Sequence, residues 1–288
     1  MTTVALPAAG STRLGRLIVT ARRFRWSVLL AGVVIGVALV AAVWPGLLTD
    51  VDPLQANPLE SNAAPSAQHL AGTDIQGRDL LARIIYGARY SLVIGLGAVL
   101  VSVTLGTLLG LAAGAGPRWL DQTICRAIDI LCAFPGVLLA LVFIAFTGPG
   151  APNLVVALGL GGIPGFARVI RTQALVARTS DYVEQAATYA LPGWRITLRH
   201  VLPNALGPVP ILATLGLGSA IVGSSGLSFL GLGPQPPTAE WGLMLSDSRN
   251  YLRVAPWTGV FPGVALTAVV IAATVLGRHW QRRYERRH

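Results

Sequence analysis

Lysine is absent from this chain of 288 residues, so its 22 basic residues are all arginines. A phosphate-binding P-loop needs a glycine-rich turn that ends in Lys-Ser or Lys-Thr, and this sequence has no such turn. The longest stretch between its later apolar runs, residues 171–203, is too short to hold a nucleotide-binding domain. The sequence therefore predicts that the chain is not an enzyme and carries no ATPase site of its own.

Charged residues are also scarce, at 12% against 53% hydrophobic residues, and the mean hydropathy is +0.63. Soluble domains contain about a quarter charged residues, so this composition indicates a membrane protein in contact with lipid. The net charge of +10 is typical of nucleic-acid binding as well. The arginines, however, gather at the chain ends and beside apolar runs, where orientation in a membrane explains them. We expect no nucleic-acid partner.

Cysteine and histidine are too few and too scattered to suggest a disulfide or a metal site. Cys125 and Cys132 lie seven residues apart in one predicted helix, which separates them by about 10 Å along its axis. A disulfide requires closer Cα atoms. The four histidines show no spacing typical of metal ligands.

Long apolar runs define the architecture, because a membrane-spanning helix needs about 20 mostly apolar residues. Six segments qualify, and the fourth is interrupted by several glycines and Pro164: 27–44, 91–115, 127–147, 151–170, 204–223 and 256–277. The first begins late and has no clear small-residue cleavage site after it, so we expect an uncleaved span. The sequence predicts an all-α membrane protein with six transmembrane helices.

Arginine clusters at the two chain ends predict the orientation. Residues 13–25 and 278–287 each contain five arginines, and the second cluster contains only Glu285 as an acid. An even number of spans places both termini on one side, and the positive-inside rule makes that side cytoplasmic. The sequence thus divides into a cytoplasmic tail (1–26), a first span with an outer segment (27–90), a five-span core (91–277) and a second cytoplasmic tail (278–288).

Charges within the predicted spans are rare, which disfavours an ion-coupled carrier. Asp129 is explained by a helical pair with Arg126, and Arg168 by a side chain that reaches the membrane surface. No repeated loop of the kind that forms an ion-channel filter is present, although a channel remains an alternative. Gly106, Gly110 and Gly114 recur at four-residue spacing and predict close packing against another helix.

The loop 171–203, on the predicted inner side, has its own pattern. Ser180 or Asp181 is suited to cap a short helix, and small residues at 186, 187 and 190 give that helix a face narrow enough to enter a groove. Leu191-Pro192-Gly193 predicts a break. Residues 194–201 then form an amphipathic helical stretch that we expect to lie on the membrane surface and to end at Pro203.

This loop resembles the EAA loop of permeases in binding-protein-dependent ABC importers. Glu184 stands at the acidic position, Ala186 at the second alanine, Ile196 at the downstream apolar site and Leu202-Pro203-Asn204 at the end of the motif. Gln185 replaces the first alanine, and Ala190 stands where glycine is expected. The resemblance implies a coupling helix that docks in a cleft of an ATPase subunit, through Tyr182, Val183, Glu184, Gln185, Ala186, Ala187, Ala190, Gly193, Arg199 and Pro203.

A second set of residues resembles the C-type permease subunit of dipeptide, oligopeptide and nickel importers. The outer segment supplies Gly72, Thr73, Asp74, Gly77, Arg78, Asp79, Arg83, Gly87, Arg89 and Ser91-Leu92, and the later chain supplies Leu227 to Gly233, Pro236-Pro237 and Trp241-Gly242. Ala82 and Ser224 depart from the usual serine and glutamate. Two interpretations of the outer motif stay open: a structural cap on the bundle, or a contact used in gating or by a binding protein.

These resemblances imply an ABC importer type I permease bundle in the plasma (inner) membrane. They further imply a heterodimer with a second permease subunit, ABC ATPase subunits and an extracytoplasmic substrate-binding protein. ATP and Mg²⁺ would bind to the ATPase subunits, and this chain would hold no cofactor. We expect di- or oligopeptides as substrates, with nickel or haem as alternatives and a stand-alone channel or ion-coupled carrier as the rival class. The sequence does not identify the substrate-binding residues.

Overall fold

The computed structural model describes residues 13–188 and 191–285, and within these residues it is helical without a named β-strand. The long helices are α1 (Arg13–Val43), α2 (Leu80–Ala115), α5 (Ala151–Arg178), α9 (Val209–Phe229) and α11 (Trp257–Glu285). The shorter ones are α3 (Arg118–Cys132), α4 (Gly136–Thr147), α6 (Asp181–Thr188), α7 (Gly193–Ile196), α8 (Leu202–Ala205) and α10 (Trp241–Ser248). Single turns are η1 (Pro45–Leu47), η2 (Pro58–Glu60) and the π-helical η3 (Thr197–Val201).

Five of the described helices are long and apolar enough to cross a membrane, and a sixth span is present if α3 and α4 are counted together. The predicted all-α membrane architecture is confirmed. The span predicted at 127–147 is not one continuous helix, because it includes the end of α3 and all of α4, which meet at an angle of 88°. Pro135 lacks an N–H group and disfavours helical backbone at Phe134, which explains the break between the two helices.

Several other helices begin or end away from the predicted span boundaries. Helix α2 begins at Leu80 rather than at residue 91, because the side chain of Asp79 caps it by accepting from the N–H of Ala82 at 2.7 Å. Helix α9 begins at Val209 rather than at residue 204. Hydropathy omits the polar first turns of α2, whereas a turn at residues 206–208 precedes α9 and delays its start.

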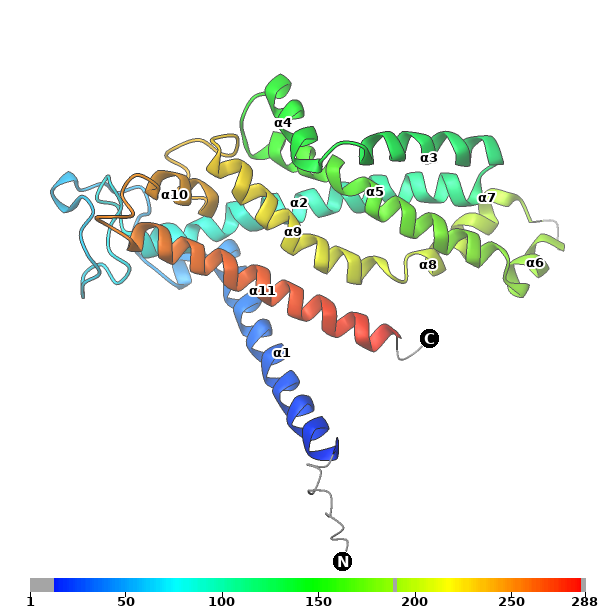
Figure 1. Ribbon diagram of the computed structural model, residues 1–288, viewed down its shortest axis with the longest axis horizontal. Helices are drawn as coiled ribbons and strands as arrows, with labels where there is room; N and C mark the ends of the chain where they lie inside the picture. The colour runs from blue at the N-terminus through cyan, green and yellow to red at the C-terminus, as the bar shows by residue number, and fades with distance from the viewer. Residues whose placement is uncertain (1–12, 189–190, 286–288) are drawn as a thin grey trace, which may run out of the picture.

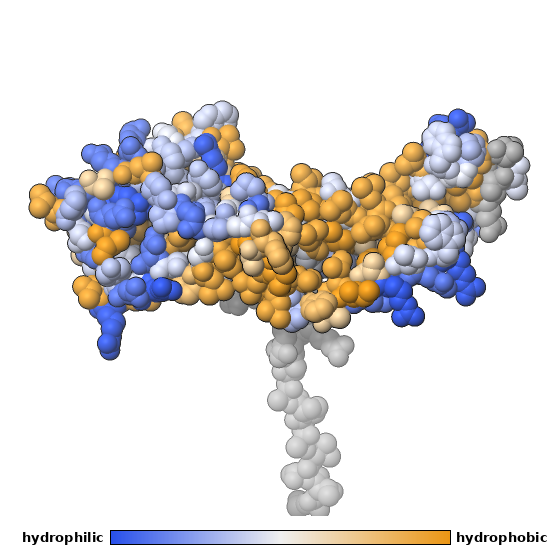
Figure 2. All heavy atoms as spheres, turned by 90° about the horizontal axis from the view of Figure 1, so that it is seen from above, coloured by the Kyte–Doolittle hydropathy of each residue, from blue (hydrophilic) through white to orange (hydrophobic). Residues whose placement is uncertain are grey.

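The long helices run roughly together, with α2 and α5 in extensive contact at the centre and α9 and α11 along one side (Figure 1). The segment 45–79 and α10 lie at one end of the bundle, and α6 to α8 lie at the opposite end. Helix α1 leaves the bundle at an angle. Figure 2 shows apolar residues across the middle of the visible face and hydrophilic residues at both ends, which is the surface that a lipid bilayer requires.

Gly106, Gly110 and Gly114 form a ridge on α2, the glycine ridge, which packs closely against another helix as predicted, and that helix is α5. A Cβ atom at Gly106 would lie 2.6 Å from Cβ of Phe166, one at Gly110 would lie 2.6 Å from the carbonyl oxygen of Ala167, and one at Gly114 would lie 2.8 Å from Cβ of Ala174. These distances are too short for any larger residue at the three positions. The absence of side chains therefore sets the approach of the two central helices.

We expect Gly110→Leu to destabilise the bundle, because overpacking of this kind costs about 1–3 kcal/mol or more. Thermal unfolding of the detergent-purified protein measures the effect. Gly36→Leu is the matched control, since a Cβ at Gly36 of α1 has no atom within 4 Å. Equal unfolding temperatures for the two variants would contradict the proposed role of the ridge.

Candidate functional site

We name the loop 45–79 and the start of α2 the outer cap, after the side on which the sequence predicts it, and two glycines shape it. Gly72 and Gly77 have φ angles of +77° and +72°, in the left-handed region that favours glycine. A Cβ at Gly72 would lie 2.8 Å from Cδ1 of Trp257, and one at Gly77 would overlap the carbonyl of Asn57. Both glycines of the sequence motif are thus required by backbone conformation and by close approach.

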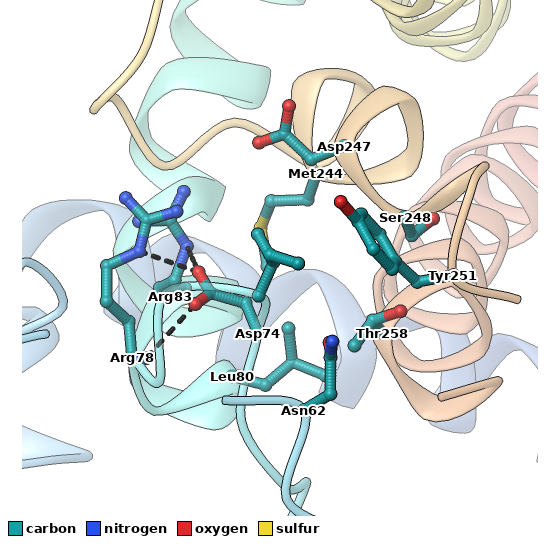
Figure 3. A pocket seen from close by; sticks show the side chains of 11 residues that line it. Asn62, Asp74, Arg78, Leu80, Arg83, Met244, Asp247, Ser248, Tyr251 and Thr258 are labelled. Carbon is teal, nitrogen blue, oxygen red and sulfur yellow. Dashed lines mark hydrogen bonds and ion pairs between the residues drawn. The ribbon is translucent and has the colours of Figure 1, made fainter. Parts of the chain in front are cut away.

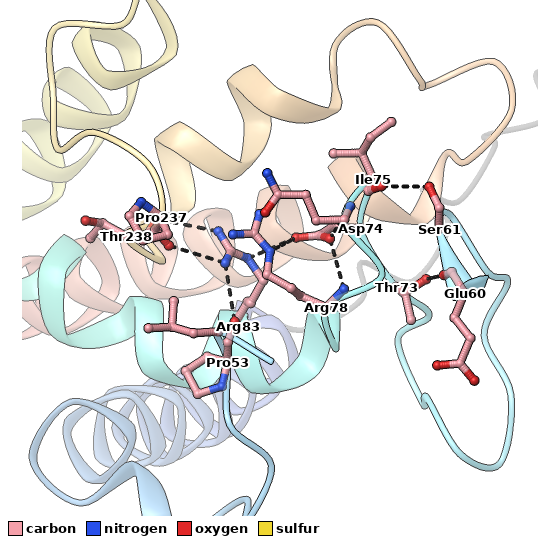
Figure 4. Close-up of polar contacts among 12 residues, drawn as sticks. Pro53, Glu60, Ser61, Thr73, Asp74, Ile75, Arg78, Arg83, Pro237 and Thr238 are labelled. Carbon is pink, nitrogen blue, oxygen red and sulfur yellow. Dashed lines mark hydrogen bonds and ion pairs between the residues drawn. The ribbon is translucent and has the colours of Figure 1, made fainter. Parts of the chain in front are cut away.

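Asp74 is the centre of a buried network of charges (Figure 4). Its Oδ2 atom lies 2.6 Å from Nε of Arg78 and 3.4 Å from Nε of Arg83. Its Oδ1 atom accepts from the backbone N–H groups of Gln76, at 2.8 Å, and Arg78, at 3.0 Å. All three charged residues are at most 8% exposed. Asp74 is thus the ion-pair partner that the two buried guanidinium groups share, and Asp247 adds a further electrostatic interaction with Arg83.

Arg83 also connects parts of the chain that are distant in sequence. Its guanidinium lies 3.4 Å from the carbonyl oxygens of Pro53 and Pro237, and 3.5 Å from that of Thr238. Pro53 belongs to the loop after α1, whereas Pro237 and Thr238 precede α10. Arg83 thus joins α2 to two separate segments of the cap.

Asp79 and Thr73 close the cap on the side of His69. Thr73 and Asp79 form an isolated antiparallel bridge, and Thr73 donates its hydroxyl to the carbonyl of Glu60. While Oδ1 of Asp79 caps α2, its Oδ2 contacts Nδ1 of His69 at 2.8 Å, and Nε2 of His69 lies 3.4 Å from Oε2 of Glu60. The hydrogen bond that His69 donates to Asp79 raises the pKa of His69 above 6.5, against the opposing effect of burial.

This contact predicts a pH dependence of stability. Because folding raises the pKa of His69, its contribution is fully present below pH 6.5 and is lost as the pH rises through the folded-state pKa. We expect the unfolding temperature to fall more between pH 6 and pH 8 in the wild type than in His69→Gln. A parallel fall in the two proteins would show that the His69–Asp79 contact carries no stabilising charge interaction.

Glu240 is a buried residue that the sequence reasoning missed. It is fully buried, and its carboxylate accepts from the N–H groups of Gly242 and Leu243, at 3.0 and 2.8 Å, and from Ser91 Oγ at 3.3 Å. Burial raises its pKa, against the effect of the two backbone hydrogen bonds. Glutamate is an unusual helix cap, so the sequence before Trp241-Gly242 did not indicate a buried carboxylate that caps a helix.

Trp241 and Gly242 pack α10 against helices α2 and α9. Nε1 of Trp241 donates to the carbonyl of Ile84 at 2.9 Å, and a Cβ at Gly87 would lie 3.2 Å from Cδ1 of Trp241. A Cβ at Gly242 would lie 2.6 Å from Cα of Ser225. These motif residues therefore set the contacts of α10 with α2 and α9.

A small cavity lies between the Asp74 network and α10 (Figure 3), with Met244, Asp247 and Tyr251 among its walls. Its volume is about 20 Å³, whereas one water needs roughly 10–15 Å³. Burial raises the pKa of Asp247, and the nearby arginines oppose that shift. The cavity has no room for a peptide.

The loop 171–203, which we name the inner loop after its predicted side, lies at the other end of the bundle and contains helix α6. Glu184, Ala186 and Ala187 lie in this helix, as predicted from their motif positions. Tyr182 and Gln185 are exposed, whereas Val183 is 5% exposed. Ala190 lies outside the described residues. The chain is not helical at Leu191 and Pro192, where a break was predicted, and Gly193 begins α7.

Asn204 of α8 connects the two helical parts of the inner loop, α6 and η3. Its Nδ2 atom donates to the hydroxyl of Tyr182 at 2.8 Å and to the carbonyl of His200 at 2.7 Å. Val201 and Ala205, at most 1% exposed, pack in one cluster with Leu111 of α2 and Ile170 of α5. The loop is therefore fixed both to itself and to the two central helices.

The prediction that the second helical stretch ends at Pro203 is wrong. After η3, which contains the exposed Arg199, the chain continues as α8 to Ala205. Pro203 is the second residue of α8 and directly follows the π-helical turn η3, so the chain stays helical through this proline.

Two ion pairs join α3 to α5. Arg171 binds Asp121 through two hydrogen bonds of 2.5 and 2.7 Å, and Nη2 of Arg168 lies 3.0 Å from Oδ1 of Asp129. The predicted pair of Asp129 with Arg126 is therefore replaced by one with Arg168. Sequence spacing favoured the local partner, whereas helix packing brings the distant one into contact.

The fold and these two ends define an integral membrane protein in which an apolar helical bundle carries a polar cap at one end and a protruding helical loop at the other. The chain belongs to the family of binding-protein-dependent transport system inner membrane components, whose model matches residues 106–288. It is thus a permease of an ABC importer and a multi-pass protein of the plasma membrane. The family predicted from the sequence motifs is confirmed.

Curated relatives agree with this assignment. The chain is 42% identical over 239 residues to the dipeptide transport system permease protein DppC of Alkalihalophilus pseudofirmus, which covers 83% of this chain and 79% of the relative. It is 42% identical over 216 residues to the glutathione transport system permease protein GsiD of Pectobacterium atrosepticum, which covers 75% and 72%. Both support a C-type permease of the peptide-importer family.

Solved structures show the same fold at low sequence identity. An inward-facing structure of the MetNI methionine ABC transporter superposes with a TM-score of 0.59 at 18% identity, over 71% of this chain and 97% of that chain. An amino acid ABC transporter with histidines gives a TM-score of 0.54 at 15% identity, over 70% and 94%.

Proposed function

We propose that this permease couples ATP hydrolysis in separate ATPase subunits to the import of di- or oligopeptides. The observation that carries the proposal is the inner loop, in which α6 stands at the end of the bundle while Asn204, Val201 and Ala205 tie the loop to α2 and α5. Because of these contacts, a displacement of α6 is transmitted to the two central helices, α2 and α5.

In the proposed mechanism, α6 docks in a cleft of an ABC ATPase subunit, and Glu184 accepts a charge-assisted hydrogen bond there. ATP and Mg²⁺ bind to the ATPase subunits, whose closure moves α6. Rigid helices α2 and α5 then carry the movement across the membrane and change which side of the pathway is open. The arginine-rich chain ends and α6 face the cytoplasm.

The remaining partners follow from the same proposal. A second permease subunit forms a heterodimer with this chain, and an extracytoplasmic substrate-binding protein delivers the substrate at the outer cap.

A cavity of about 380 Å³ between α2, α4, α5 and α9 is lined largely by small residues, among them Ser102, Gly162, Gly216, Ser219 and Gly223. Small neutral walls suit a pathway that binds its cargo weakly.

Peptides are the preferred substrate class, because relatives named for dipeptide and glutathione transport are both about 42% identical to this chain. Uptake of a labelled dipeptide, glutathione and ⁶³Ni²⁺ should be compared in a strain that lacks this chain and in the complemented strain. We expect complementation to restore peptide uptake only. Restoration of nickel uptake alone would overturn the peptide assignment, and transport by the isolated chain in liposomes without ATP would overturn the permease mechanism.

A further inference from the structure

An open apolar groove lies beside the inner loop, and Val183 and Gly193 of the predicted coupling set form part of its wall. It has a volume of about 680 Å³, and its walls are the last turns of α2, the first turn of α3 and the chain from α6 to η3. We call it the inner groove. Leu108 and Leu198 are 63% and 55% exposed, while Val183 and Val201 in its wall are almost fully buried.

Apolar walls of this extent favour an apolar occupant, because water gains nothing from contact with them. The groove belongs to the last turns of a membrane-spanning helix, so it is positioned to receive lipid from the adjacent leaflet. Trp194 in its wall is 62% exposed, and Trp119, which precedes the lining residue Leu120 in the sequence, is 66% exposed. Exposed tryptophans of this kind mark the level of lipid headgroups.

The charge at the groove has one sign. Among the described residues that line it, Arg178 is the only charged one, and it donates to the carbonyl of Gly114 at 3.3 Å. The guanidinium of Arg195 lies 5.4 Å from the ring centre of Trp194, and Arg118 is exposed at the start of α3. Basic pockets beside the ends of transmembrane helices attract anionic headgroups.

We propose that the inner groove binds an anionic phospholipid, with an acyl chain against Leu108 and Leu198 and the headgroup at Arg178 and Arg195. The lipid separates the end of α2 from α7 and so touches the same loop that carries α6. This inference goes beyond the proposed function and does not depend on the transported substrate. An ATPase subunit or the second permease would be a competing occupant.

Photo-crosslinking in the assembled transporter tests the proposal. The complex is reconstituted in phosphatidylcholine nanodiscs that contain either phosphatidylglycerol or phosphatidylcholine with a diazirine in one acyl chain, and adducts are mapped by mass spectrometry. We expect adducts within 108–120 and 193–201, at least about fivefold more from phosphatidylglycerol. Equal labelling by the two lipids, or no adducts in these segments because a protein subunit covers them, overturns the proposal.

Variants distinguish lipid bound in the groove from lipid that contacts the rest of the membrane-facing surface. Ala115→Phe places a ring in the groove and should abolish the adducts, whereas Leu100→Phe, at a 64% exposed position of α2 outside the groove, should leave them unchanged. The exposed pair Arg178→Gln and Arg195→Gln provides a second test that leaves the groove open. It should remove the preference for phosphatidylglycerol, and a retained preference would contradict the proposed headgroup site.

Discussion

Glu184→Arg should abolish ATP-driven uptake while the protein still inserts into the membrane. The expected defect has two physical sources: loss of a charge-assisted hydrogen bond worth roughly 1.5–3 kcal/mol, and introduction of a positive charge where the ATPase presents a donor. The first source alone reduces docking by about 10- to 150-fold. Uptake and ATP hydrolysis by inverted or reconstituted membranes measure the two activities separately.

Thr172→Arg is the matched control for that experiment, because it adds the same side chain at an exposed position of α5 outside α6. Its uptake should stay close to that of the wild type. If Glu184→Arg transported normally, or if both variants lost transport equally, Glu184 would have no specific role in docking.

Asp74→Asn should strongly destabilise the outer cap. The substitution preserves the shape of the side chain but leaves the guanidinium groups of Arg78 and Arg83, which are 3% and 2% exposed, without their shared counter-charge. Breaking a buried ion pair by removal of one charge costs about 3–5 kcal/mol. Thermal unfolding of the purified protein, supported by limited proteolysis of the loop 45–79, measures the loss.

Asp52→Asn removes the same charge from an exposed position of the same loop. Exposed substitutions usually change stability by less than about 0.5 kcal/mol, so its unfolding temperature should match that of the wild type. A wild-type unfolding temperature for Asp74→Asn would show that the two buried arginines do not depend on this carboxylate.

Features that depend on local sequence were predictable. The apolar centre of each span follows from composition, and the close packing of α2 on α5 follows from three glycines at four-residue spacing. The bend between α3 and α4 was also encoded locally, at Pro135, but the apolar character of residues on both sides favoured one continuous span. The extra turns of α2 were missed because Arg83 and Arg89 reduce the hydropathy of its first residues.

Features that depend on distant partners were not predictable from one sequence. Asp129 had Arg126 within reach on its own helix, and only the packing of α5 beside α3 shows that Arg168 is its partner. Motif resemblance singled out Asp74 and Arg83, but it gave no reason why they are needed. Their burial in one network supplies that reason, whereas a contact of the cap with a binding protein stays a prediction.

Directional cysteine labelling tests the central claim most directly, after Cys125 and Cys132 have been replaced by alanine. Gln185→Cys lies on an exposed position of α6, and Leu59→Cys lies in the outer cap at a position that is 95% exposed. In intact cells, a membrane-impermeant maleimide should label only Leu59→Cys. In the assembled complex, Gln185→Cys should crosslink to an ATPase subunit. Labelling of Gln185→Cys from outside, or no crosslink to an ATPase when the complex is complete, would contradict the account.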